Sequence, residues 1–217
     1  MPAPDPDFIV ASAGSPVSVA VEPAHNALNS LLLLVKADKL SGLDEWVIRT
    51  SGALTPEQRH NNRLVLLGLH YAVVPGQSWP SFPAYVDHLA AQDPTTMRDR
   101  IFNAYAQFPE DGECCGAPDP TQEQASIDTA PLLQSVDAFL EFLAKRFPAE
   151  SLDYEIESEA HRYLNDLPAM QSLLVSHFRS MWEGFLAPEW DRVAPMLRAS
   201  ADAFQQLDLN LNLNKLS

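Results

Sequence analysis

The sequence predicts an all-α protein, a multi-helix bundle with one short N-terminal β-strand. Between residues 17 and 207, apolar side chains recur at helical spacing, which places them on one face of each helix. Prolines mark many helix starts, because the first turn does not need the N–H that proline lacks. Ser, Thr or Asp before several of these prolines can cap that turn. The starts are Glu22-Pro23, Thr55-Pro56, Ser81-Phe82-Pro83, Asp93-Pro94, Ala130-Pro131, Leu167-Pro168 and Ala187-Pro188.

The N-terminal third is predicted to contain an arm, a strand and three helices. Residues 1–16 are interpreted as a flexible arm, and Val17, Val19 and Val21 then alternate with other residues as in a half-buried strand. Thr55 and Gln58 have the spacing of a capping box, in which each side chain bonds the other residue's backbone N–H. The helices are predicted over residues 23–35, 43–54 and 56–74.

Two shorter helices, a long loop and four further helices are predicted in the remaining chain. The aromatic turn 79–83 leads into one helix, and Asp93-Pro94 opens the next. Residues 109–128 form a loop whose length is typical of functional or disordered segments. The last helices are predicted over residues 131–147, 153–165, 168–185 and 189–207. One helical regulatory domain thus spans residues 17–207. A tail, 208–217, follows it, and the alternating residues 207–213 are a candidate partner for the N-terminal strand.

Composition and charge exclude several classes of protein. The 217 residues include 29 Asp and Glu against 14 Lys and Arg, a net charge of −15. An acidic chain repels the phosphate backbone, so we expect no nucleic-acid binding through this chain alone. No apolar run approaches the roughly 20 residues that span a bilayer, so we expect no membrane contact. The acidic, proline-rich N-terminus lacks the features of a signal peptide, and we expect a cytoplasmic protein.

Metal and catalytic motifs are not found. Cys114 and Cys115 are the metal candidates, but adjacent thiols chelate one ion poorly without a third ligand, and we expect no metal or cofactor. Nucleophile, dinucleotide and phosphate-loop motifs are absent as well. The carboxylates of Glu155, Glu157 and Glu159 are interpreted as a solvated helix face. The sequence therefore does not indicate an enzyme.

A set of aromatic and histidine side chains is the candidate ligand pocket. We expect it between segment 79–85 and the helix that begins at Pro131 or Pro168, because pockets combine apolar walls with a few polar anchors. Plain core packing is the competing interpretation. The candidate residues are Trp79, Phe82, Tyr85, His88, His177 and Trp182.

Three segments resemble a subgroup of ArsR-type transcriptional regulators. They are residues 21–31 (VEPAHNALNSL), 79–85 (WPSFPAY) and 181–190 (MWEGFLAPEW), and the likeness extends over residues 17–205. In that subgroup a large helical region precedes a C-terminal winged helix-turn-helix. This chain ends about a dozen residues after Phe204 and leaves no recognition helix. The metal-sensing members' cysteines are not matched.

The resemblance implies a regulatory domain, ligand-sensing or dimerising, of an ArsR-like regulator, with no DNA-binding domain in this chain. Such regulators are generally dimeric, so a homodimer and a small-molecule effector are the expected partners. Two alternatives stay open. One is a small enzyme with an unrecognised His and carboxylate site, and the other is a structural interaction domain.

Overall fold

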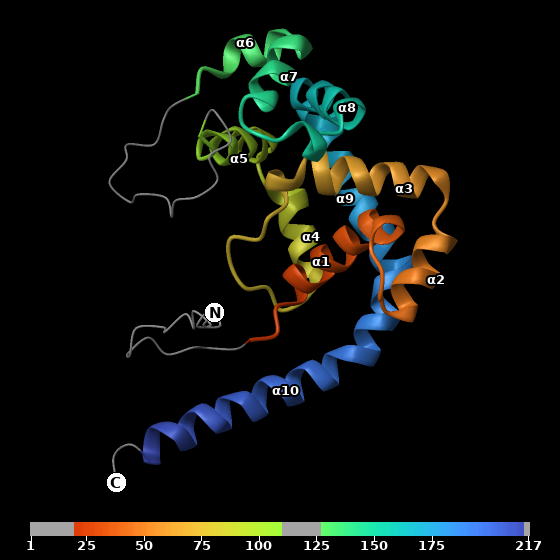
Figure 1. The fold of residues 1–217 in the computed structure, drawn as a ribbon, viewed down its shortest axis with the longest axis vertical. Helices are drawn as coiled ribbons and strands as arrows, with labels where there is room; N and C mark the ends of the chain where they lie inside the picture. Colours follow the sequence, from red (N-terminus) through yellow and green to blue (C-terminus); the bar gives the residue numbers. More distant parts are fainter. Residues whose placement is uncertain (1–19, 110–126, 215–217) are drawn as a thin grey trace, which may run out of the picture. The chain divides into compact units, whose positions relative to one another are not determined.

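A computed structural model describes residues 20–109 and 127–214, and every regular element in these ranges is helical (Figure 1). The all-α prediction is therefore confirmed for the described part of the chain. The α-helices are α1 (Pro23–Lys36), α2 (Glu45–Ala53), α3 (Pro56–Arg63), α4 (Phe82–Ala91), α5 (Pro94–Ala106), α6 (Thr129–Gln134), α7 (Val136–Ala144), α8 (Tyr154–Asn165), α9 (Leu167–Met181) and α10 (Ala187–Asn214). Three 3₁₀ turns, η1 (Ala37–Lys39), η3 (His70–Ala72) and η4 (Ala149–Ser151), and two π-helical turns, η2 (Leu64–Gly68) and η5 (Trp182–Leu186), complete the list.

Helix α9 is the core of the larger of two compact units, which spans Glu22–Trp190. It contacts α3, α4, α5 and α8. Its apolar face follows helical spacing, with Met170, Leu174, Phe178 and Met181 fully buried. A helix enclosed by four neighbours holds the bundle together, because each neighbour buries its own apolar stripe against it.

The proline starts of α1, α3, α4, α5 and α9 are confirmed, since each has Pro in its first turn. Thr55 and Gln58 form the predicted capping box at α3. The hydroxyl of Ser81 and the carboxylate of Asp93 cap α4 and α5 by accepting backbone N–H groups. Capping of this kind contributes about 1 kcal/mol per helix. These cap residues therefore help to fix the helix starts that the sequence predicts.

The predicted helix 131–147 is two helices. Its first part, α6, begins at Thr129 with Asp128 as the cap, before Pro131. Ser135 then adopts an extended conformation, ends α6, and accepts the N–H of Ala138 as the cap of α7. The break follows from this serine, which favours a cap over a helix interior.

No break separates α9 from α10, although Ala187-Pro188 predicts a new helix. The π-helical turn η5 joins them, with the N–H of Ala187 bonded to the carbonyl of Trp182. A π turn shifts the hydrogen-bond register by one residue, so Pro188 enters at a position where its missing N–H costs little.

Neither of the two predicted strands, near residues 17–21 and at residues 207–213, is found as a strand in the described part of the chain. Ala20 and Val21 are not in a strand, and residues 17–19 lie outside the described residues, as do the predicted arm, most of loop 109–128, Cys114 and Cys115. The proposed strand at residues 207–213 is wrong, because α10 runs to Asn214. Extending an existing helix costs far less than starting one, and leucine is a good helix former, so the alternating pattern was misleading.

No described helix is long and apolar enough to cross a membrane.

The segment after α3 lies directly against α8. The π-helical turn η2 ends at Gly68, and a Cβ there would lie 2.7 Å from the Cβ of Ala160 and 3.3 Å from Cγ2 of Ile156. No side chain fits at this distance, so glycine permits the two backbones to approach. This contact places the residues that follow η2 beside the first turns of α8.

Candidate functional site

The six predicted pocket residues lie in packed surroundings. Phe82 is fully buried, with its ring centroid 5.6 Å from Phe178 and 5.5 Å from Trp182. The rings of Trp79 and His88 are 4.5 Å apart, and the Trp79 ring lies 5.9 Å from that of Tyr85. Segment 79–85 therefore contacts α9, the helix that begins near Pro168, through direct ring packing of Phe82 on Phe178. Ligand binding by these six residues stays a prediction.

His177, the remaining candidate, belongs to a buried polar link between three helices. The side-chain amide of Asn62 on α3 donates to the carbonyl of Leu31 on α1, at 2.8 Å. Its oxygen is therefore the acceptor for Nε2 of His177 on α9, at 3.1 Å. Burial lowers the pKa of His177 to about 4, so the ring is neutral near pH 7 and Nε2–H donates. His177 therefore serves as the hydrogen-bond donor to the buried side-chain amide of Asn62.

A cavity of about 200 Å³ lies elsewhere, around η3 and the start of α8. Its lining is mostly aliphatic and aromatic, and five of the side chains carry polar groups: those of His70, Tyr71, Tyr105, Ser151 and Glu157. None of the six predicted residues is among those that line it. The lining residues are Leu66, Leu67, His70, Tyr71, Tyr105, Leu143, Phe147, Ser151, Leu152 and Glu157.

Glu157 is the distinctive member of this lining. It is 7% exposed, and its Oε2 atom has no hydrogen-bond partner among the described residues. Burial, and then the negative charge of Asp153, raise its pKa to about 7. The interpretation of Glu157 as part of a solvated face is therefore wrong.

Helical spacing in the sequence indicates that Glu157 lies on the buried face of its helix. It stands three and seven residues before Ala160 and Leu164, both fully buried, on the apolar stripe of α8. A carboxylate on an apolar stripe is unusual, because charged residues are rarely buried without a partner.

Three aromatic rings also line the cavity. Tyr71 and Tyr105 meet edge to face, with centroids 5.5 Å apart, and Phe147 lies 5.7 Å from Tyr105. Burial raises the pKa of both tyrosines, that of Tyr105 also through the negative charge of Glu157. Burial lowers the pKa of His70, whose Nδ1 has no partner in the described part. All three polar rings are neutral near pH 7.

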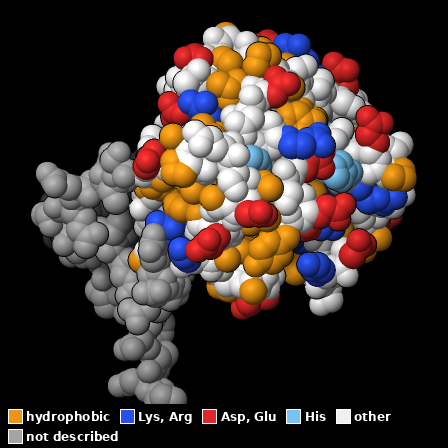
Figure 2. Space-filling view, turned by 90° about the horizontal axis from the view of Figure 1, so that it is seen from above, with side chains coloured by type: hydrophobic (Ala, Val, Ile, Leu, Met, Phe, Trp, Pro, Cys, Tyr) orange, Lys and Arg blue, Asp and Glu red, His pale blue; other side chains and the backbone are white. Residues whose placement is uncertain are grey.

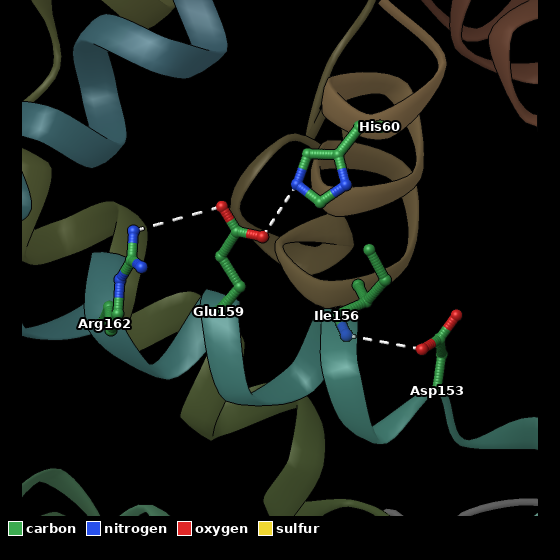
Figure 3. Close-up of polar contacts among 5 residues, drawn as sticks. All are labelled: His60, Asp153, Ile156, Glu159 and Arg162. Carbon is green, nitrogen blue, oxygen red and sulfur yellow. Dashed lines mark hydrogen bonds and ion pairs between the residues drawn. The ribbon is translucent and has the colours of Figure 1, made fainter. Parts of the chain in front are cut away.

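A separate polar band joins α3 to α8 at the surface (Figure 3). Nε2 of His60 lies 2.7 Å from Oε2 of Glu159, whose other oxygen is 4.0 Å from Arg162. Asp153 caps α8 by accepting the N–H of Ile156 and also pairs with Arg63. These groups do not line the cavity. They fix the first turns of α8, which carry Glu157.

Figure 2 shows one face of the molecule, on which acidic side chains stand beside basic ones. Within residues 20–109 and 127–214, no group of three or more His, Cys, Asp or Glu side chains could hold a metal ion. Comparison of the chain with protein-family models, with curated proteins and with solved structures finds no match.

Proposed function

We propose that this chain is the ligand-sensing region of an ArsR-like transcriptional regulator and binds a small, largely apolar molecule in the cavity around Glu157. The resemblance of residues 21–31, 79–85 and 181–190 supports the family. The net charge of −15 supports a region that acts on DNA only through another part of a regulator. The cavity is the observation that carries the sensing role.

The size and chemistry of the cavity fit a small molecule. An apolar protein cavity of about 150 Å³ holds benzene, so about 200 Å³ accommodates a slightly larger ring. Leu66, Leu143 and Phe147 provide apolar walls, while Glu157 and His70 are polar members of the lining. Few polar anchors in an apolar pocket are typical of small-molecule sites.

Indole, a neutral two-ring probe, tests this proposal. We expect saturable indole binding in calorimetry, and its loss in the Leu152→Trp variant, where the larger ring fills the cavity. Leu152 lies between η4 and α8, so the change disturbs no helix interior. Leu40→Trp is the matched control, because Leu40 is a 47% exposed loop leucine away from the cavity. Indole binding that survives Leu152→Trp, or no binding at all, would contradict the proposal.

Binding rather than catalysis is the activity that the lining supports. An acid–base site needs a second group within hydrogen-bond reach of the first. Oε2 of Glu157 and Nδ1 of His70 have no such partner in the described part. His60 and Glu159 are in reach of each other, but their side chains are 42% and 22% exposed and lie outside the cavity.

Self-association is the second part of the proposal. Met196, Leu197 and Phe204 of α10 are 62%, 38% and 43% exposed, and the spacing of seven residues between Leu197 and Phe204 places these two side chains on one helix face. We expect light scattering at several concentrations to give a dimer, and Phe204→Glu to give a monomer. Ile48→Glu, at a 61% exposed position of α2, should remain dimeric. A strict monomer in the unmodified chain would overturn this part.

A further inference from the structure

We propose that the cavity selects an amphiphilic amine, with an apolar body about the size of a phenyl ring and one ammonium group that pairs with the Glu157 carboxylate. The inference rests on the proposed function, in that it names the class of molecule the same cavity takes. Two features of the lining carry it: the sign of its charge and the chemistry of its aromatic wall.

The charge of the lining can only be negative or zero near pH 7. Among its ten residues, Glu157 is the one acid, and there is no Lys or Arg. His70 is held neutral by burial, which lowers its pKa. The Glu157 side chain is more than nine-tenths buried, so its carboxylate attracts a cation strongly because little water screens the charge. An anionic ligand would meet repulsion and find no basic partner.

The aromatic wall favours the same class of ligand. Tyr71, Tyr105 and Phe147 form a contiguous cluster of rings at the cavity. Ring faces attract a cation, and they also bury an apolar body without needing hydrogen bonds. Leu66, Leu67 and Leu143 complete the apolar surface. A molecule with an ammonium group at one end and a hydrocarbon body at the other satisfies both parts.

Protonation of Glu157 gives this binding mode a measurable signature. Because burial raises the pKa of Glu157 to about 7, its carboxyl group is largely protonated at about pH 6. An ammonium ligand pairs with the ionised form, so binding releases this proton to the solvent. The other groups near Glu157 do not supply a competing charge change: the pKa values of Tyr71 and Tyr105 are raised and that of His70 is lowered. The carboxylate of Asp153 forms an ion pair with Arg63 at the surface.

Three probes of equal size test the charge preference: 2-phenylethylamine, 2-phenylethanol and phenylacetate. At about pH 8 we expect the amine to bind at least tenfold more tightly than the alcohol, since a charge-assisted hydrogen bond is roughly twice as strong as a neutral one. Phenylacetate should not bind. Below about pH 7 the affinity for the amine should fall about tenfold per unit, while that for the alcohol stays constant. Calorimetry at about pH 6 in two buffers of different ionisation enthalpy should show close to one proton released per amine.

Glu157→Gln and Glu159→Gln form the matched pair of variants, because both residues are on α8 but only Glu157 lines the cavity. Glu157→Gln should weaken the amine about tenfold or more and leave the alcohol within about twofold. Glu159→Gln should leave both unchanged. Equal binding of amine and alcohol, or an amine unaffected by Glu157→Gln, overturns the amine inference and leaves the cavity's binding role standing. No binding of indole to the unmodified protein overturns the proposed function itself.

Discussion

Replacing Asn62 by alanine is expected to lower the free energy of unfolding by about 3 kcal/mol, because two buried groups each lose a hydrogen-bond partner worth roughly 1–3 kcal/mol. Asn62 is 1% exposed and bonds the carbonyl of Leu31 and the ring of His177. Water cannot replace these partners in a closed core. Urea denaturation at about pH 7 measures the loss.

Asn61→Ala is the control, since Asn61 is the same residue type one position earlier on α3 and outside the buried link. It should change stability by less than about 0.5 kcal/mol. A second variant, Asn62→Leu combined with His177→Leu, removes both side chains of the link. It should be more stable than Asn62→Ala, because the unpaired histidine is gone and apolar volume is restored. Equal stability of the Asn61→Ala and Asn62→Ala variants would contradict the proposed role of the link.

Replacing Glu157 by glutamine is expected to stabilise the protein at alkaline pH by up to about 3 kcal/mol, the free energy equivalent of a pKa raised from 4.5 to about 7. Between these two pH values the folded state holds a proton that the unfolded state has lost. The stability due to the neutral carboxyl is therefore complete below pH 4.5 and is lost as the pH rises through 7. Glutamine has the same shape and never ionises, so it avoids this loss.

The measurement is the difference in unfolding free energy between Glu157→Gln and the unmodified protein across about pH 4.5 to 8.5. It should grow with pH and level off above pH 7. The difference between Glu157→Gln and the unmodified protein must be used, because His177 makes stability depend on pH in the opposite direction and its contribution cancels in the difference. Its pKa is lowered to about 4, so its neutral form favours folding above pH 6.5 and this stability is lost as the pH falls. Glu159→Gln should show no such growth, and a flat difference for Glu157→Gln would show that the carboxyl is ionised in the folded protein.

The sequence predicted helix positions well wherever a local signal determined them. Pro56 with Thr55 and Gln58 marks a start that depends only on neighbouring backbone groups. Ser135 was missed because its cap competes with a continuous apolar pattern on both sides. The strand prediction at residues 207–213 is wrong because alternating leucines fit a strand by their pattern but a helix by their propensity. The helix that precedes them decides between the two, since extending it costs less than starting a new element.

The site was harder to predict, because a cavity depends on contacts between distant segments. His70 and Glu157 are far apart in the sequence, and only the approach of η2 to α8 at Gly68 brings their segments to one cavity. The aromatic composition of segment 79–85 predicts a ligand pocket there, yet Phe82 packs directly against Phe178 and Trp182. Composition gives the side chains that can line a pocket, whereas their packing decides which ones do.

The π-helical turn η2 also sets the phase of the chain that follows it. The N–H of Leu69 reaches back five residues to the carbonyl of Leu64, at 3.0 Å, so this turn holds one residue more than an α-helical turn. One extra residue rotates everything after it by about 100° around the helix axis. His70 and Tyr71, which follow this turn in the 3₁₀ turn η3, form part of the cavity wall. A change in the length of this turn, and not only a change of side chain, would therefore alter the wall of the cavity.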